Sequence, residues 1–503
     1  MQKIEGLDYL KLTKWQRFCY KIKYFFCSIP AFFWNLLCTI GRFFKKLGLG
    51  IFNWFKGIGL TFAHGDWKTK VSYFVMGFGS IARGQVLRGI LFFLMEVVFI
   101  FYMIFYGGYY IGMFRSLGLK QPINIEEEGT FIPGDNSFRI LLYGALTLFF
   151  IIAFIYTWNL NIKQNRIAQE YEKENKKLDS SLDDLRSLVD KQFYKTLLAL
   201  PTLGIIVFTL LPIFFMILVA FTTYDGNHDG IRNALFGWAG LDNFDTLFSW
   251  SNGSNNFSAT FGEILLWTLI WAFFATFTNY FLGMVVAMII NKKGIKLKKV
   301  WRTVLVLSIA IPQFISLLYV KNMFEYPSGF FNEIIKFFGG QPVHFLDDLA
   351  NPWTARISVI LINIWIGIPY LMLVTTGILM NIPADLYESA NIDGASAWQQ
   401  YSKITLPYML FVTGPYLLTS FTGNMNNFNV IYLLTGGAPK AGDLAGNAGR
   451  TDLLITWLFK LSINDSNYKL GAVIGIIVFI VVAVISLVVY NLIPSTRNEE
   501  EFQ

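Results

Sequence analysis

Six residues inside two long apolar stretches have types and spacing that suit ligand binding. In each stretch they lie four and then three positions apart, which places them on one face of a helix. A side-chain amide both donates and accepts hydrogen bonds, and a tyrosine ring offers a flat surface with a polar tip. The pattern therefore predicts a site for a neutral polyol such as a sugar. The residues are Asn363, Gly367 and Tyr370 in the first stretch, and Ser420, Asn424 and Asn427 in the second.

A purely structural role is the alternative for each of these residues. Asn and Ser in apolar segments often hydrogen-bond neighbouring helices in membranes, and for any one residue that role is the more common. Two faces at matching depth favour a lined pathway, because polar residues deep in a span are costly and tend to be functional. Neither face carries a charge, so a charged ligand is not expected.

Groupings typical of enzymes or metal sites are absent from the sequence. The three histidines are far apart, and the three cysteines lie within the first 40 residues without metal-ligand spacing. No G-x-x-x-x-G-K-[ST] motif is present, so this chain is not expected to bind ATP or Mg itself. Glu96 lies deep in an apolar stretch. It could carry a proton, although a structural hydrogen bond or a contact with a partner is the favoured role.

The elements that must carry these residues are membrane-spanning helices. Hydrophobic residues make up 54% of the 503 residues and charged residues only 15%, whereas soluble proteins carry about 25% charged residues. A helix of about 20 apolar residues crosses a hydrocarbon layer of about 30 Å. The sequence thus predicts an all-α integral membrane protein with eight transmembrane helices. They span residues 89–110, 139–159, 196–221, 262–290, 303–322, 354–380, 408–435 and 467–491.

The basic residues of the connecting segments predict the orientation. Residues 1–85 contain 13 basic and three acidic residues, and residues 291–302 contain six basic and no acidic residues. Basic loops stay in the cytoplasm, so both termini are expected there. The segment 381–407 must also be cytoplasmic by parity, yet it holds three acidic residues against Lys403 alone.

The spans and charges also divide the chain. Basic and aromatic residues interleave over the first 85 positions, which predicts amphipathic helices in the cytoplasmic interface rather than a cleavable signal. The expected parts are an interfacial region at 1–85, a transmembrane pair at 86–159, a charged helical linker at 160–195, a six-helix core at 196–491 with the loop 381–407, and a cytoplasmic tail at 492–503.

The acidic loop has the pattern of a helix-turn-helix with a small-residue tip. Residues 388–395 read ESANIDGA and residues 401–407 read YSKITLP. Pro383 can start a helix, and Glu388 lies early in it. Gly394 permits a turn between two short helices, and Pro407 marks the entry to the seventh span. Such a tip suits insertion into a groove on another protein.

These residues resemble the EAA loop of binding-protein-dependent ABC transporter permeases. The family pattern is E-A-A-x-x-D-G-A followed by an aromatic residue and I-x-L-P, and this chain departs from it only at Ser389. The resemblance implies a type I ABC importer permease fold in a bacterial cell membrane. It also implies that this loop contacts a cytoplasmic ATPase, with the contact residues Glu388, Ala390, Asp393, Gly394 and Ala395.

Three further segments resemble the maltose/maltodextrin permease subunit (MalF-type) of that family. They are residues 363–370 (NIWIGIPY), 420–428 (SFTGNMNNF) and 433–439 (LLTGGAP). The resemblance implies that Asn363, Gly367, Tyr370, Ser420, Asn424 and Asn427 line the sugar site. The fifth span departs from the family, because Ile309 and Gln313 flank Pro312 where the maltose protein has Tyr and Ser.

The resemblance implies three partners: a second permease subunit, a cytoplasmic ATPase dimer that binds ATP and Mg, and an extracellular solute-binding protein. Maltodextrin is the first choice of substrate, and galacto-oligosaccharides, raffinose-type sugars and glycerol phosphate are alternatives. An ion-coupled secondary transporter is a rival function, which would require carboxylates or broken helices in the membrane. A membrane enzyme is a third possibility that no residue cluster supports.

Overall fold

The computed structural model describes residues 14–121, 123–125, 130–132, 134–178, 180–229, 235–249, 256–292 and 294–492. Within these residues the structure is helical, apart from one antiparallel hairpin of β1 (Ile123–Ile125) and β2 (Thr130–Ile132), in which Ile123 lies opposite Ile132. The expectation of an all-helical membrane fold is confirmed. The predicted tail at 492–503 lies outside the described residues except for Leu492.

The chain forms two compact units. Unit 1 comprises Met1–Arg115 and Arg139–Pro212, and unit 2 comprises Ser116–Phe138 and Ile213–Gln503. The boundary between the units falls within the third span, between Pro212 and Ile213, and the predicted parts of the chain stay predictions.

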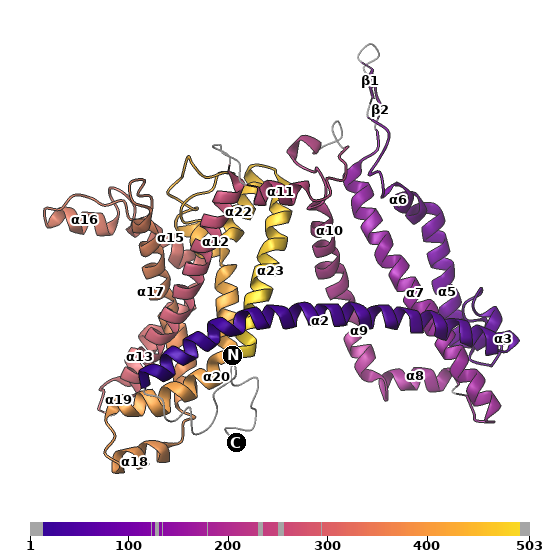
Figure 1. Cartoon of the computed structure of the whole chain (residues 1–503), viewed down its shortest axis with the longest axis horizontal. Helices are drawn as coiled ribbons and strands as arrows, with labels where there is room; N and C mark the ends of the chain where they lie inside the picture. The colour runs from indigo at the N-terminus through magenta and orange to yellow at the C-terminus, as the bar shows by residue number, and fades with distance from the viewer. Residues whose placement is uncertain are drawn as a thin grey trace. The chain divides into compact units, whose positions relative to one another are not determined.

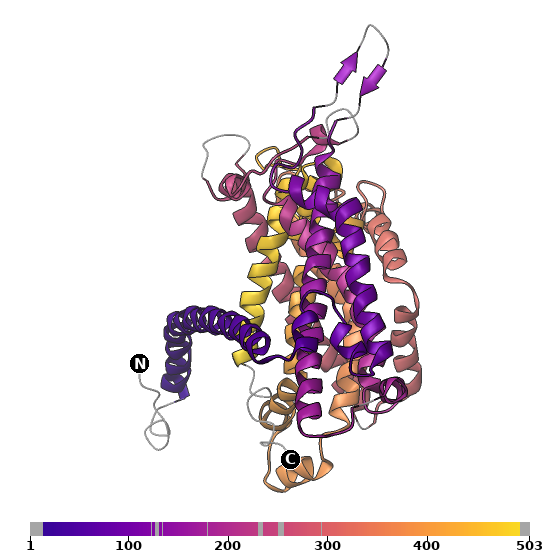
Figure 2. The ribbon, with the colours of Figure 1, turned by 90° about the vertical axis from the view of Figure 1, so that its right-hand side faces the viewer.

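Unit 1 combines a long N-terminal helix with two paired spans. Its helices are α2 (Lys14–His64), α3 (Trp67–Val71), α4 (Phe78–Ile81), α5 (Val86–Tyr102), η1 (Met103–Gly107), α6 (Gly108–Met113), α7 (Ser137–Lys173), α8 (Ser181–Val189), α9 (Phe193–Ile205) and η2 (Ile206–Leu210). The interfacial region is therefore mostly one helix of 51 residues, which is visibly curved in Figure 2. Spans α5 and α7 pair through stacked rings, with Phe99 and Phe154 3.9 Å apart.

A buried ionic network joins the end of α2 to α7. The Arg83 side chain is fully buried and donates to Asp66, directly after α2, at 2.7 Å and to Glu172 of α7 at 3.0 Å. Partial burial acts to raise the pKa of Asp66, but hydrogen bonds from Thr69 and the charge of Arg83 outweigh it and lower the pKa. The carboxylates compensate the buried guanidinium, so this junction is held in one geometry.

Unit 2 contains the remaining helices. They are α10 (Leu211–Val219), η3 (Gly226–His228), α11 (Asp242–Phe248), α12 (Phe257–Phe273), η4 (Phe274–Thr278), α13 (Asn279–Asn291), α14 (Lys298–Ala310), α15 (Gln313–Met323), α16 (Phe330–Phe337), α17 (Pro352–Leu379), α18 (Ala384–Ile392), α19 (Ala397–Gln400), η5 (Tyr401–Thr405), α20 (Leu406–Met425), α21 (Phe428–Leu434), α22 (Leu454–Phe459), η6 (Lys460–Asn464) and α23 (Tyr468–Leu492).

The long helices of unit 2 run side by side, with α18 at one end of the bundle (Figures 1 and 2). Helix α17 packs along α13, and small residues permit the close approach. An added Cβ at Gly283 of α13 would lie 2.7 Å from Cβ of Leu371 in α17. The fully buried Trp267 and Trp271 of α12 belong to the main hydrophobic core. This core fixes α12, α17 and α21 relative to one another.

Seven helices in the described residues are long and apolar enough to cross a membrane, and a bent pair makes up to eight. The bent pair corresponds to the fifth predicted span. A single helix was expected there, but the structure has two helices. Helices α14 and α15 meet at 95°, with Ile311 in an extended conformation before Pro312. Proline lacks the N–H that a helix needs and disfavours a helical residue before it, so the helix breaks at this point.

Candidate functional site

Helix α17 carries the first predicted polar face. Pro352 begins the helix, with the Asn351 side chain accepting a hydrogen bond from Trp353 N at 3.2 Å. Along this face Asn363 is buried, Gly367 is half-buried and Tyr370 is 50% exposed. The face thus includes an exposed aromatic ring and a buried amide.

Gly367 lies directly against Asn279 at the start of α13. An added Cβ at Gly367 would be 2.6 Å from Nδ2 of Asn279. This amide is buried and donates to Ala275 O at 2.9 Å, but its Oδ1 atom is buried without a hydrogen-bond partner among the described residues. An unpaired buried acceptor is costly. In this structure the atom is enclosed beside Gly367, so a ligand donor could reach it only after the helices around it move.

Helix α20 carries Ser420 and Asn424, and Asn424 is tied to the fourth span. Its Nδ2 donates to Thr276 Oγ1 at 3.0 Å, and its backbone oxygen accepts from Trp271 Nε1 at 3.1 Å. Thr276 belongs to η4, a π-turn within the fourth span. The Nδ2 group of Asn424 therefore links two helices. This is the structural role that was the alternative to sugar binding.

The spacing predicts that Asn427 shares a helix face with Ser420 and Asn424. In the structure it does not. The seventh span does not continue to residue 435, because α20 ends at Met425 and Asn427 is the N-cap of α21. The Asn427 Oδ1 atom accepts from Val430 N at 3.4 Å. Asn favours this position because its side chain competes for backbone N–H groups. Its Nδ2 still donates to Asn424 Oδ1 at 3.3 Å, so the two amides are adjacent.

The two polar faces approach each other near Tyr416 of α20. Tyr416 lies one turn before Ser420 on α20 and interacts electrostatically with Tyr370 of α17. Helix α17 contacts α20, and both contact η4. The structure therefore places two of the predicted residues beside this π-turn: Gly367 lies against Asn279, and Asn424 bonds to Thr276.

Sequence reasoning missed the contribution of the fourth span. Thr276, Asn279 and Tyr280 interrupt an apolar run, and Tyr280 accepts a hydrogen bond from Thr413 of α20 at 2.8 Å. The sixth and seventh spans were selected because they contain polar residues, which are costly within a span. Residues 276–280 meet the same criterion and could have been selected in the same way.

The acidic loop folds as the sequence predicts. Helix α18 ends at Ile392, Gly394 has a φ of +70°, and α19 begins at Ala397 after the N-cap Ser396. Ala395 N donates to Ala390 O at 2.9 Å, which closes the turn in the manner of a glycine-containing helix end.

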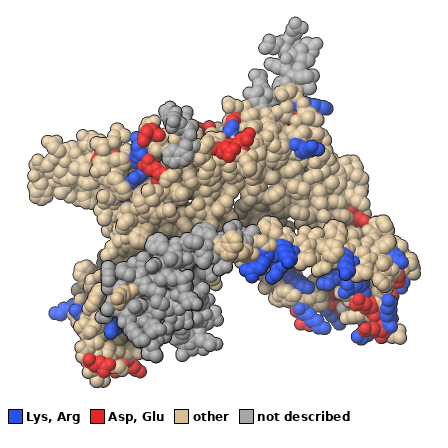
Figure 3. Space-filling model, in the orientation of Figure 1, with Lys and Arg blue, Asp and Glu red and all other residues tan. Residues whose placement is uncertain are grey.

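The tip of this loop is exposed. Glu388, Asp393 and Gly394 are exposed, and Ala390 and Ala395 are half-buried. Exposed apolar side chains surround them, with Ile392 87% and Trp398 72% exposed. Acidic side chains gather over α18 in Figure 3. An apolar surface with a charged rim is typical of a protein interface.

The loop is continuous with the seventh span. Helices α19, η5 and α20 form one apolar helix of 29 residues from Ala397 to Met425, about 43 Å long at 1.5 Å per residue. The sequence predicts that Pro407 marks the entry to this span. In the structure Pro407 lies within the helix instead. The π-turn η5 directly precedes α20, whose second residue is Pro407, and such turns accommodate a missing N–H. One helix thus connects the exposed tip to Ser420 and Asn424.

Comparison with known proteins assigns the family. The family model described as "Binding-protein-dependent transport system inner membrane component" matches residues 279–498. The maltodextrin transport system permease protein MalC of Streptococcus pneumoniae serotype 4 (strain ATCC BAA-334 / TIGR4) is 33% identical over 433 residues, covering 85% of this chain and 95% of MalC. The chain belongs to the binding-protein-dependent transport system permeases.

Two further proteins resemble this permease. The galactooligosaccharides transport system permease protein GanP of Bacillus subtilis (strain 168) is 33% identical over 427 residues, covering 84% of the permease and 97% of GanP. A chain of the crystal structure of a bacterial alginate ABC transporter, in complex with an alginate pentasaccharide-bound periplasmic protein, has a TM-score of 0.50. It is 21% identical and covers 62% of the permease and 98% of that chain. At this identity the likeness shows the fold alone.

Two acidic residues of the permease have structural partners. Glu96 of α5 accepts a hydrogen bond from Met76 N at 2.8 Å, which agrees with the structural role favoured from sequence. Glu263 of α12 pairs with Arg356 at 3.0 Å and Arg450 at 2.6 Å. Arg356 also stacks on the Trp267 ring, 4.9 Å from its centroid. These carboxylates stabilise local packing through bonds within the permease.

Proposed function

We propose that this permease subunit moves a neutral oligosaccharide across the bacterial cell membrane, driven by ATP hydrolysis in a separate subunit. The observation that carries the proposal is the helix from Ala397 to Met425. It joins an exposed small-residue tip, suited to a partner protein, to amides at the centre of the bundle. A displacement of this helix at Ala397, three residues after Gly394, would therefore reach Asn424 along one continuous helix.

An uncharged ligand fits the chemistry around η4. The residues that meet there supply amides, hydroxyls and an aromatic ring, and the Asn279 Oδ1 atom has a free acceptor position. Sugar hydroxyls match such groups. Glycerol phosphate would call for a fixed positive charge, which none of the six predicted site residues provides. The chemistry thus supports a sugar over that alternative.

Maltodextrin is our first choice of sugar. The relative named for maltodextrin transport and the one named for galactooligosaccharide transport are equally identical to this chain over similar lengths. Overall identity therefore does not separate the two. The segments 363–370 and 420–428, which resemble the maltose protein, favour maltodextrin, whereas Ile309 and Gln313 argue against an unchanged site.

The proposed complex contains a second permease subunit, an ATPase dimer and an extracellular solute-binding protein that delivers the sugar. ATP and Mg would be bound by the ATPase, which would contact Glu388, Ala390, Asp393, Gly394 and Ala395. Closure of the ATPase dimer would move α18 and α19. The helix α19–η5–α20 would then reorient Ser420 and Asn424 relative to α17, so that the site opens to one side of the membrane at a time.

An energy-source experiment tests this function against the ion-coupled rival. The complete transporter is reconstituted in vesicles with its ATPase, and uptake of radiolabelled maltotriose is measured with and without ATP and a protonophore. We expect uptake that requires ATP and is unchanged by the protonophore. Uptake that persists without ATP and stops with the protonophore would contradict the proposal. Competition by unlabelled galactobiose would assign the sugar to the alternative.

A further inference from the structure

Helix α2 has two opposite faces of different chemistry between residues 41 and 64. Arg42, Lys45, Lys46 and Lys56 fall within about 100° of the helix circumference, an arc that also carries Leu49 and Leu60. The opposite face has an apolar residue at every third or fourth position, which is the pattern of an amphipathic helix. Its residues are Phe44, Leu47, Ile51, Phe55, Ile58 and Phe62.

In the described part of the chain, most of this apolar face is exposed. Phe44 and Phe55 are 62% and 61% exposed, and Ile51 is 49% exposed. A contiguous apolar surface of this length marks an interaction site. Residues 41–64 contain no acidic residue, and Figure 3 shows basic side chains along the described part of α2.

Contacts within unit 1 fix which way the apolar face points. The Phe62 ring lies 5.1 Å from the Tyr73 ring, and Tyr73 lies 5.7 Å from Trp158 of α7. Trp158 lies near the end of the apolar part of α7, three residues before the polar Asn161. Tryptophans are enriched at such membrane edges. The apolar face of α2 therefore points toward the membrane side of this boundary.

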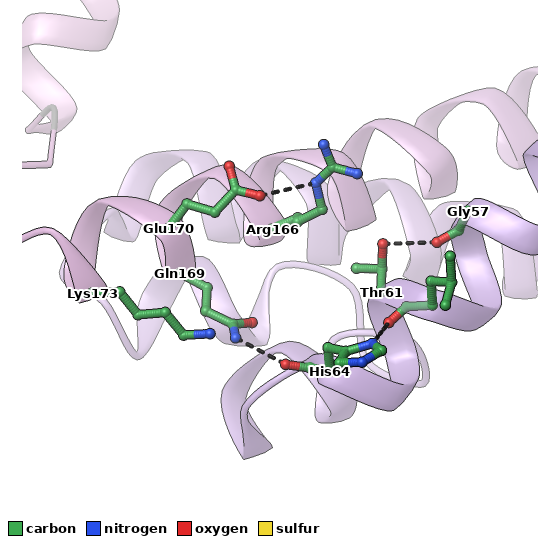
Figure 4. A pocket seen from close by; sticks show the side chains of 8 residues that line it. Gly57, Thr61, His64, Arg166, Gln169, Glu170 and Lys173 are labelled. Atoms are coloured by element: carbon green, nitrogen blue, oxygen red, sulfur yellow. Dashed lines mark hydrogen bonds and ion pairs between the residues drawn. The ribbon is translucent and has the colours of Figure 1, made fainter.

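The other side of α2 faces the polar extension of α7. A cavity of about 240 Å³ lies between the two helices, with Thr61 and His64 of α2 facing Arg166, Gln169 and Lys173 of α7 (Figure 4). Gln169 Nε2 donates to His64 O at 3.1 Å. Together with the Arg83 network, this contact holds α2 so that its polar side faces the aqueous side.

We propose that residues 41–64 lie in the cytoplasmic leaflet, with the apolar face on the lipid acyl chains and Arg42, Lys45, Lys46 and Lys56 binding the phosphates of anionic phospholipids. The apolar face continues onto the aromatic residues at the membrane edge, so lipid rather than a protein groove is its occupant. Basic side chains beside an apolar face are attracted to anionic headgroups. This interaction does not depend on which sugar is transported.

Paired spin labels on the full chain test the position of the helix. Cys19, Cys27 and Cys38 are replaced by Ser, and a single Cys is introduced at Ile51 or Asn53, two exposed positions on opposite faces. The labelled protein is placed in nanodiscs containing phosphatidylglycerol. We expect a several-fold higher ratio of oxygen to nickel-chelate accessibility at position 51 than at 53. Equal ratios, or protection of position 51 from both reagents, would overturn the proposal, the latter in favour of a protein occupant.

Matched lysine pairs test the charge requirement. The double substitution K45E/K46E is compared with K176E/K177E, an exposed lysine pair beyond the end of α7. We expect the first to abolish the high accessibility ratio at position 51 and the second to leave it unchanged. Nanodiscs of pure phosphatidylcholine should give the same loss. Retention of the ratio in K45E/K46E or in phosphatidylcholine would refute a role for anionic lipids.

Discussion

At the scale of single residues, the contact between Gly367 and Asn279 shows why the site needs a glycine. The Asn279 amide lies where a side chain at position 367 would be, and its Nδ2 atom is committed to Ala275 O. A methyl group could enter only if this hydrogen bond broke or the helices moved apart. The glycine therefore fixes the distance between α13 and α17 beside a free acceptor atom.

Gly367→Ala should destabilise the permease by about 1–3 kcal/mol, the usual cost of overpacking a tight contact. Asn279→Ala in the same chain should recover most of this loss, because it removes the atoms that the methyl group meets. The measurement is thermal aggregation followed by fluorescence-detected size exclusion. If the double variant were no more stable than G367A, the contact would not be the cause. Transport by the double variant should stay low, since the free acceptor is also lost.

Asn424 has two roles that separate variants can distinguish. Asn424→Ala removes both the amide and its bond to Thr276, whereas Thr276→Val removes only the bond. Hydrogen bonds between membrane helices are worth about 0.6 kcal/mol on average, so both variants should assemble normally. We expect uptake to fall strongly in N424A and little in T276V. Equal uptake in the two variants would indicate that Asn424 acts only as a link between helices.

At the scale of elements, the helix from Ala397 to Met425 is the feature that relates the loop to the site. A proline at position 407 would ordinarily end a helix or begin one. The π-turn before it allows the helix to continue instead. Residues 397–400 of the loop and Asn424 consequently lie on one continuous helix, so a displacement at one end would be transmitted to the other.

Gly394→Phe should prevent ATPase binding without unfolding the spans. A Cβ at this position meets no atom within 4 Å, although its φ of +70° is strained for any side chain. Gly394→Ala carries the same backbone strain, about 1–2 kcal/mol, without the bulk. ATPase retention in a pull-down should therefore be lost in G394F and largely kept in G394A. Equal retention in both variants would show that the tip is not at the interface.

At the scale of the whole molecule, the membrane topology decides whether the tip can meet a cytoplasmic partner. Eight crossings result if the bent pair α14 and α15 counts as one span. The loop around α18 then lies on the same side as the N-terminal region, and the loop that contains Asp443 lies on the opposite side. If the bent pair turned back without crossing, these two loops would exchange sides.

Impermeant thiol labelling tests this arrangement. In a chain whose native cysteines are replaced by Ser, single cysteines are introduced at Ser396 in the tip and at Gly442 in the loop after α21, both exposed. We expect Ser396→Cys to be labelled only in inside-out vesicles and Gly442→Cys only in right-side-out vesicles. Labelling of both positions from one side would contradict a crossing by α20, and the reverse pattern would contradict a crossing by the bent pair. Labelling of denatured samples controls for thiol reactivity.

The sequence alone determined the features that arise from local chemistry. Apolar stretches long enough to cross a bilayer predicted the spans, because lipid forces every backbone group into an internal hydrogen bond. The helix-turn-helix at residues 383–400 followed from its caps and from Gly394, which depend only on neighbouring residues. The family resemblance rested on these same short segments.

Tertiary structure decided the features that depend on contacts between distant residues. No sequence pattern indicated that Asn279 would meet Gly367, because the two lie on different helices. It placed Asn427 on a helix face, but the amide instead caps α21 next to Asn424. Continuity through Pro407 and the break at Pro312 also depended on context, since a proline's effect is set by whether the surrounding packing can absorb the lost hydrogen bond.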